Sequence, residues 1–297
     1  MPAISIEQCI ERACLLESTS RKPGNVHPGA SFEHLVYEDF VASAAAIAPV
    51  LARTAQVGVG KSIFEAVKAT RQVCEHNTNL GIILLLAPLA AVPLDVSLAA
   101  GITSILDQLT REDAEHVFAA IRLAAPRGLG TASDQDVSNS APDGTLTEVM
   151  SLAADRDAIA QQYVTDFSLV LKRAVTTLTA SGRFEDDWEL AIIRLHIELI
   201  AIEGDTDIAR KCGVIDAHES KRRAASVLSA GWPMAMEGRL RFREFDRWLR
   251  ARGSQRNPGT TADLITAAVF AILRDQHADM PSRDEIRIRA EENRVVQ

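Results

Sequence analysis

The amino-acid sequence predicts an all-α fold, a single globular domain built from many helices. Aromatic residues make up only 5% of the 297 residues, while Ala and Leu are abundant, which favours helices packed through small side chains. Apolar residues recur at helical spacing along most of the chain. No clear run of alternating apolar and polar residues lies between hairpin turns.

The first expected helix covers residues 4–18. Its core-facing stripe lies on one helical face and consists of Ile6, Ile10, Ala13 and Glu17. A carboxylate on such a stripe is costly to bury unless it is paired or functional. We interpret Glu17 either as a metal ligand or general base near a nucleotide, or as a helix-end carboxylate paired with Arg21 or Lys22.

Two further helices are expected to begin with capping boxes, in which side chains and backbone of the first turn exchange hydrogen bonds. Ser62 and Glu65 have this spacing in a helix over 61–76, and Thr110 and Asp113 have it in a later helix.

The stretch 77–94 carries no charge and could be mistaken for a membrane span. A spanning helix needs about 20 apolar residues. Pro88 and Pro93 interrupt this run, and three polar residues open it. We therefore expect a buried core helix and no membrane partner.

The second half of the chain contains few helix breakers. Helical patterns cover 154–180, 186–203, 217–230, 236–251 and 261–275. Before them, residues 126–147 are rich in Gly, Ser, Asp and Pro, and we interpret this long loop as a lid. We expect the catalytic domain to span 1–280 and a charged tail to cover 281–297.

The formal net charge of −8 argues against a nucleic-acid-binding surface. The four cysteines are scattered without a metal-type pair, as is typical of reduced thiols. The first residues show no signal-peptide pattern. We therefore expect a cytoplasmic protein that acts on small molecules, with a homodimer as one option.

Four short polar islands interrupt the helical pattern and carry the candidate functional residues. They cover 21–29, 76–81, 203–211 and 257–264, and each sets small residues beside Asn, Asp, Lys or Arg at an expected helix end. Helix ends expose unpaired backbone groups and carry partial charge. Gathered in space, four such ends would form a pocket for phosphates, a metal ion and a ribose.

The first two islands offer phosphate and nucleotide ligands. Lys22 is a candidate phosphate ligand and Asn25 a candidate nucleotide contact, with a solvated surface turn as the alternative. Side chains of Asn77, Thr78 and Asn79 could bind a base, a ribose or a metal-bound water. Thr78 or Asn79 could equally cap the next helix.

The third island places Glu203, Asp205 and Asp207 within five residues, directly after an apolar helix. Mg²⁺ prefers oxygen ligands, so these carboxylates are candidate metal ligands. Arg210 and Lys211 follow and are candidate phosphate ligands. The alternative is helix capping by Asp205 or its neighbour.

The fourth island opens the helix over 261–275. Asn257, Gly259 and Thr260 are candidate nucleotide or phosphate ligands, because a helix N-terminus preceded by glycine is an anion site. Thr260 and Asp263 also have capping-box spacing, with Asp in place of Glu. The charge of Asp263 would oppose a bound phosphate unless a cation lies between.

These islands, in this order, resemble the triphosphoribosyl-dephospho-CoA synthase family. The likeness spans residues 5–275 and rests on a helix carrying Glu17, then Lys22-Pro23-Gly24, Asn77-Thr78, Asp205-Thr206 followed by Arg210, and Asn257-Pro258-Gly259 followed by Ala262-Asp263-Leu264. The resemblance implies an all-helical transferase that moves the triphosphoribosyl group of ATP onto dephospho-CoA and releases adenine.

The chain departs from the family pattern at the second island. The family motif continues His-Lys-Gly, whereas this chain has Asn79-Leu80-Gly81 and lacks a lysine that could touch phosphate. We interpret the chain as a divergent branch, of the kind found in organisms with archaeal-type one-carbon metabolism. Its acceptor is then dephospho-CoA or a related cofactor precursor.

The implied reaction suggests roles for the candidate residues. Displacement of adenine at ribose C1′ passes through an oxocarbenium-like state and needs an acid, a base and a metal clamp on the triphosphate. We expect Glu17 and Asp205 to be catalytic. The other expected roles are Mg²⁺ on Asp205, Asp207 and Glu203, phosphates on Lys22, Arg210 and Lys211, and nucleotide contacts from Asn77 and Asn79.

Two other functions stay open. The run Gly204-Asp205-Thr206-Asp207 is similar to the metal motif of helical ADP-ribosylglycohydrolases, which hydrolyse at ribose C1′, but their N-terminal Gly-Asp motif is not seen here. A non-catalytic nucleotide-binding protein would keep the same pocket without turnover.

Overall fold

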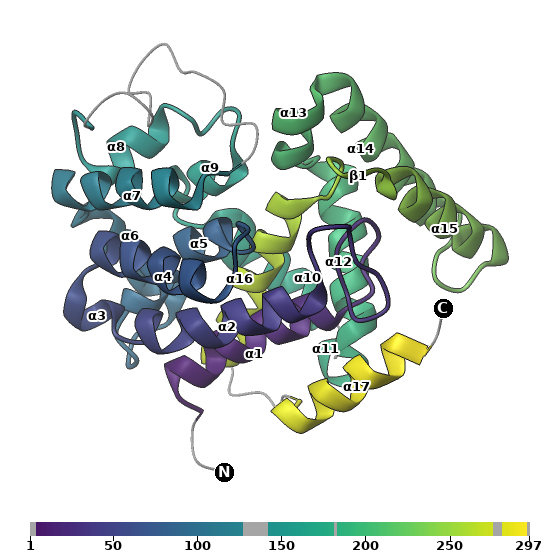
Figure 1. Cartoon of the computed structure of the whole chain (residues 1–297), viewed down its shortest axis with the longest axis horizontal. Coiled ribbons are helices and arrows are strands. Elements are labelled where there is room, and N and C mark those ends of the chain that lie inside the picture. The colour runs from purple at the N-terminus through teal and green to yellow at the C-terminus, as the bar shows by residue number, and fades with distance from the viewer. Residues whose placement is uncertain (1–3, 127–141, 181–182, 276–280, 296–297) are drawn as a thin grey trace.

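The computed structural model describes residues 4–126, 142–180, 183–275 and 281–295, and it is helical almost throughout (Figure 1). The all-α prediction is confirmed. The described extended segments are one short strand, β1 (Ala251–Ser254), and two isolated bridges. Most of the loop interpreted as a lid lies outside the described residues.

The helices of the first half are α1 (Ile6–Thr19), α2 (Tyr37–Leu51), α3 (Thr54–Val57), α4 (Val59–Val73), α5 (Leu80–Ala91), α6 (Leu98–Asp107), α7 (Arg111–Ala124) and α8 (Leu146–Ser151). Those of the second half are α9 (Ala158–Val164), the π-helix η1 (Leu169–Ala174), α10 (Val175–Thr179), α11 (Arg183–Asp186), α12 (Trp188–Ile202), α13 (Thr206–Cys212), α14 (Val214–Ser229), α15 (Met236–Arg250), α16 (Gly259–Asp275) and α17 (Arg283–Val295).

Helix α16 runs through the middle of the molecule (Figure 1) and is buried along nearly its whole length. Around it, α1, α2, α4, α5 and α7 contribute most of a large apolar core. A second, smaller core joins α12, α13, α14 and α15 through residues such as Ile197, Ile208 and Phe245. The fold therefore has two packed halves that meet at α12 and α16.

Two helix starts test the capping predictions. The capping box at Thr110 and Asp113 forms and opens α7, as predicted. The box predicted at Ser62 is wrong, because α4 begins three residues earlier, at Val59. The Ser62 hydroxyl lies buried inside the helix with no partner among the described residues.

Helix α5 is the buried core helix that the apolar stretch predicts. Every residue from Ile82 to Ala90 is buried, and Tyr163 Oη donates a hydrogen bond to the Leu84 carbonyl at 2.6 Å. No helix in the described ranges is long and apolar enough to cross a membrane.

The helical stretch expected over 154–180 is interrupted. It divides into α9, η1 and α10, because Asp166 and Phe167 adopt left-handed conformations with φ of 50° and 56°. The break is stabilised by Phe167, whose backbone N–H donates to the Gln162 carbonyl at 2.9 Å.

The C-terminal helix α17 lies against the end of α1. Asn293 Nδ2 donates to the Thr19 carbonyl and to Glu189 Oε1, both at 3.0 Å. Glu189 also accepts a hydrogen bond from Arg21 Nε at 2.9 Å. Helix α17 thereby braces the chain where the first island begins. The division into a domain over 1–280 and a tail over 281–297 stays a prediction.

Candidate functional site

A cavity of ≈ 970 Å³ opens between α5, α7, α8 and α9 on one side and α13 and β1 on the other, and all four islands reach it. The predicted site residues that line it are Glu17, Asn25, Asn77, Thr78, Asn79, Asp207, Arg210, Lys211, Asn257, Gly259 and Thr260. Lys22, Glu203 and Asp205 are not among the lining residues. The structure thus gathers segments that lie far apart in the chain.

Lys22 and Glu17 form a buried ion pair at the end of α1. The Lys22 side chain is 0% exposed, and its Nζ lies 3.0 Å from Glu17 Oε1. Nζ also donates to the carbonyl oxygens of Ser20 and Glu17. Burial raises the pKa of Glu17 and lowers that of Lys22, and the attraction between the two charges opposes both shifts. These contacts match the interpretation of Glu17 as a paired helix-end carboxylate.

An amide contact joins the first and fourth islands. Asn25 Nδ2 donates to Asn257 Oδ1 at 2.7 Å and to the Pro258 carbonyl at 3.4 Å. Asn25 is only 5% exposed, and its Oδ1 has no hydrogen-bond partner among the described residues. An unpaired buried acceptor is costly unless a ligand completes it.

The second island forms the N-terminus of α5. Asn79 is the N-cap residue, one of the two predicted, but its side chain makes no capping hydrogen bond. Asn77 Oδ1 instead accepts from the Leu80 N–H at 3.0 Å. Thr78 instead shares a 2.7 Å hydrogen bond with Ser43. Asn79 Oδ1 accepts from Thr70, which leaves the buried Asn79 Nδ2 without a partner in the described part of the chain.

Asp205 connects the third and fourth islands. Its Oδ1 accepts from the Ile208 N–H at 2.9 Å, which caps α13 as the alternative interpretation predicted. Its Oδ2 accepts from the N–H and hydroxyl of Thr261 at 2.8 and 2.7 Å. Burial and the nearby Asp207 raise the pKa of Asp205 to about 6, although these hydrogen bonds oppose the shift.

The capping box predicted for Thr260 and Asp263 does not form. Thr261 is capped by Asp205 instead, and Thr260 Oγ1 accepts from the Thr206 hydroxyl at 3.1 Å. The physical reason is that a carboxylate from another helix already occupies the start of α16.

The three predicted metal ligands each have other partners. Asp207 is paired with both Arg210 and Lys211. Glu203 is paired with Arg173 and does not line the cavity. Both oxygens of Asp205 accept protein hydrogen bonds. Within the described residues, no group of three or more His, Cys, Asp or Glu side chains could hold a metal ion. The arrangement does not support a metal site made from these three residues.

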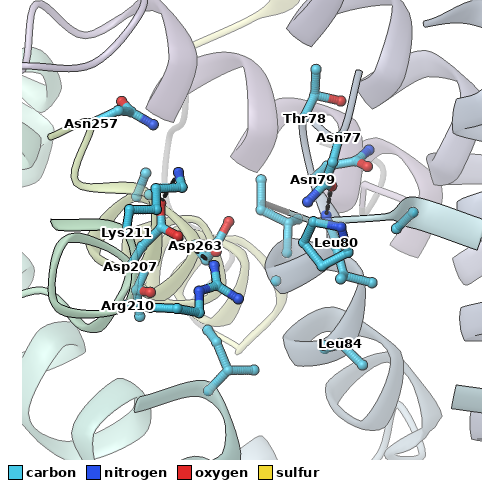
Figure 2. A pocket seen from close by; sticks show the side chains of 18 of the residues that line it. Asn77, Thr78, Asn79, Leu80, Leu84, Asp207, Arg210, Lys211, Asn257 and Asp263 are labelled. Atoms are coloured by element: carbon cyan, nitrogen blue, oxygen red, sulfur yellow. Dashed lines mark hydrogen bonds and ion pairs between the residues drawn. The ribbon is translucent and has the colours of Figure 1, made fainter. Parts of the chain in front are cut away.

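Asp263 is a cavity residue to which the sequence patterns assigned only capping. It lies in the second turn of α16, between the side chains of α13 and those of the α5 N-terminus in the view of Figure 2. A Cβ atom on Gly81 would stand only 2.0 Å from Asp263 Oδ2, so this contact requires glycine. Burial raises the pKa of Asp263 well above its usual range, and the negative charges of Asp207 and Glu17 raise it further.

The far wall of the cavity is apolar. It is formed by α5, α7, α8 and α9, and includes Leu84, Val117, Phe118, Ile121, Leu146, Val149, Met150 and Ile159. The opposite wall carries Asp207, Arg210 and Lys211 (Figure 2). A large cavity with one apolar wall and a few polar groups suits a ligand that has both an apolar part and charged groups.

Comparisons with known proteins agree with this picture. The family model CitG, ATP:dephospho-CoA triphosphoribosyl transferase, matches residues 3–282. Over 74 residues the chain is 32% identical to a Pseudomonas paraeruginosa protein named "Probable 2-(5''-triphosphoribosyl)-3'-dephosphocoenzyme-A synthase". That match covers 25% of this chain and 25% of that protein, so it spans a quarter of the relative's length.

A solved structure is also similar. It comes from Archaeoglobus fulgidus, and its description names triphosphoribosyl-dephospho-CoA synthase. The alignment covers 79% of this chain and 98% of that chain, with a TM-score of 0.59 and 22% sequence identity. At this identity the likeness establishes a shared fold.

Proposed function

Because the chain belongs to the ATP:dephospho-CoA triphosphoribosyl transferase family, we propose that it transfers the triphosphoribosyl group of ATP to a hydroxyl group of dephospho-CoA or a related cofactor precursor, releasing adenine. The observation that carries the proposal is the cavity in which all four islands meet. Its cationic wall and apolar wall suit a nucleotide with a polyphosphate chain.

Arg210 and Lys211 are the proposed phosphate ligands. Both line the cavity from α13, and both are paired with Asp207, so a phosphate group would share their positive charge with that carboxylate. Lys22 contributes indirectly, because its ammonium group is fully buried against Glu17 and holds the first island in place.

The amide groups are the proposed nucleotide contacts. The unpartnered Asn25 Oδ1 can accept a hydrogen bond, and the unpartnered Asn79 Nδ2 can donate one. Asn257, Gly259 and Thr260 complete this polar surface at the start of α16. Glu17 remains a candidate base at the cavity edge, whereas the contacts of Asp205 favour a positioning role.

Magnesium is proposed to enter as the counter-ion of the substrate triphosphate. The side chains of Glu203, Asp205 and Asp207 have the protein partners described above and do not fit a resident metal site. We also carry forward a cytoplasmic location and a homodimer as proposals from the sequence. The family match does not favour the glycohydrolase or the non-catalytic alternative.

Release of free adenine from MgATP, with and without dephospho-CoA, tests the proposal. Transfer predicts that adenine appears only with the acceptor, in equal amount with a product whose mass equals dephospho-CoA plus the triphosphoribosyl group. Release of adenine from MgATP in the absence of dephospho-CoA would instead identify a hydrolase. ATP binding with no release under either condition would identify a nucleotide-binding protein. Lys61 is exposed, and the variant Lys61→Ala serves as a control that we expect to retain wild-type turnover.

A further inference from the structure

Asp263 is a carboxyl group of the cavity lining that forms no ion pair within the described residues. Glu17 is paired with Lys22, and Asp207 is paired with two cations from α13. Asp205 is held by backbone and hydroxyl donors. Among the described residues, Asp263 has no hydrogen bond and no ion pair, although its side chain faces the same cavity. An unpaired carboxyl group in such a place points to a function for the group itself.

The position of Asp263 is fixed by close packing. Its Oδ2 lies against the backbone of α5 at Gly81, where any side chain would collide with it. Figure 2 shows it between Asp207, Arg210 and Lys211 on one side and Asn79 and Leu80 on the other. The carboxyl group can therefore reach a ligand that spans from the cationic wall to the amide side chains that precede α5.

The surroundings of Asp263 favour its neutral, protonated form. The ionisable groups that interact electrostatically with Asp263 are Glu17, Cys14, Asp157, Asp205, Asp207 and Arg210. Carboxylates outnumber the cationic side chains in this set. Burial and the charges of Asp207, Glu17, Asp205 and Asp157 raise the pKa of Asp263 well above the ordinary carboxyl value.

Asp207 and Asp263 differ in their partners. Asp207 is paired with two cations, whereas Asp263 forms no ion pair within the described residues. A carboxyl group of the cavity lining that is not held in an ion pair is able to hold and donate a proton, as the general acids of glycosyl-transfer sites do.

We propose that Asp263 is the catalytic general acid that protonates the departing adenine. This inference rests on the proposed function. The C1′–N9 bond breaks and its electron pair goes to adenine, whose ring nitrogen takes the Asp263 proton. The acceptor hydroxyl oxygen forms the new C1′–O bond, and the proton it loses restores the Asp263 acid. Adenine and the triphosphoribosyl product are the only products of the cycle.

The test compares Asp263→Asn with wild type on two nucleotides, ATP and 7-methyladenosine triphosphate. The methylated ring is already positively charged, so it leaves as a neutral base without a proton from the enzyme. Loss of a general acid costs about 10²–10⁴-fold in rate. We expect a loss in this range with ATP and a loss below about tenfold with the methylated nucleotide. Asp95→Asn, at an exposed aspartate that is not among the lining residues of the cavity, is the matched control.

An equal loss on both nucleotides would overturn the inference, because a structural or binding defect does not depend on the leaving group. No loss on either would overturn it as well. Wild-type protein that releases no adenine from ATP with dephospho-CoA contradicts the proposed function instead. In that case a ligand-free measurement tests whether the folded protein holds Asp263 in its acid form, as the inference requires. The difference in Tm between Asp263→Asn and wild type should grow as the pH rises from about 4, because the unfolded wild-type chain then loses a proton that the folded protein retains on Asp263, and wild type loses stability. A constant difference would overturn it.

Discussion

Asp205 and Thr261, which are 56 residues apart in the chain, join the N-termini of two helices, and the Thr261 N lies 2.8 Å from Asp205 Oδ2. The same carboxylate also caps its own helix, α13, through Ile208. One side chain thus fixes the third island against the fourth. Asp207 and Asp263, two residues on from each end of this contact, are held on neighbouring parts of one cavity.

Replacement of Asp205 by Ala should destabilise the protein more than loss of an ordinary cap. It leaves buried N–H groups of two helices unpaired, and we expect the free energy of unfolding to fall by about 3 kcal/mol. Thr110→Ala, which removes the cap of α7 alone, should cost about 1 kcal/mol. Urea denaturation measures both. Equal losses in the two variants would contradict a shared cap.

Gly81→Ala should disrupt the contact with Asp263. The new Cβ atom would lie 2.0 Å from Asp263 Oδ2, so either the side chain or α5 must move, at a cost of about 1–3 kcal/mol. Asp263→Ala removes the colliding carboxyl group, so Gly81→Ala should cost much less in that background. Thermal unfolding of the two single variants and the double variant measures this coupling. Additive effects would show that the two positions do not touch.

Lys22→Met should be among the most destabilising changes in the chain. It leaves the buried Glu17 carboxyl group without its cation, and removing one partner of a buried pair costs about 3–5 kcal/mol. The double variant Glu17→Gln/Lys22→Met leaves no unpaired charge and should unfold at higher urea than Lys22→Met. Arg241→Ala breaks only exposed pairs, with Glu237 and Glu244, and should cost less than about 1 kcal/mol. A loss from Lys22→Met as small as that control would contradict the pairing.

His196 should make the protein sensitive to mild acid. It is fully buried, its Nε2–H donates to the Pro23 carbonyl at 3.1 Å, and burial together with Lys22 lowers its pKa to about 3. The unfolded chain binds this proton more tightly, so stability is retained above about pH 6.5 and is lost as the pH falls below it. Between pH 7 and 4.5 the contribution is on the order of 2 kcal/mol.

His196→Gln removes this titration, so its free energy of unfolding should fall less than that of wild type over the same pH range. His218→Gln, at an exposed histidine, should follow the wild-type curve. Parallel curves for wild type and His196→Gln would contradict the assignment.

The helices could be predicted from the sequence because their signals are local. Apolar spacing gave α1, α12 and α16 to within a few residues, and the Thr110 box formed as expected. The break after α9 could not be predicted, because Phe167 is a bulky residue that rarely adopts left-handed backbone, and its side chain is held there fully buried in the core.

The islands were also visible locally, but their contacts depend on packing between distant segments. The short spacing between Thr260 and Asp263 indicated a capping box, whereas Asp205 supplies that cap from another helix. The spacing therefore predicts a backbone contact for Asp263, whereas the structure places this residue in the cavity lining. Gly81, Glu189 and His196 matter through partners that are remote in sequence, so spacing alone carried no signal for them.

The central claim is that separate chain segments build one nucleotide site. Calorimetric titration of MgATP into wild type, Asn25→Ala, Asn79→Ala and Lys211→Ala tests it most directly, because each variant alters a different island. We predict one site per chain in wild type and a loss in affinity of about tenfold or more in each variant, which corresponds to about 1.4 kcal/mol. Wild-type affinity in two or more of these variants would contradict the account.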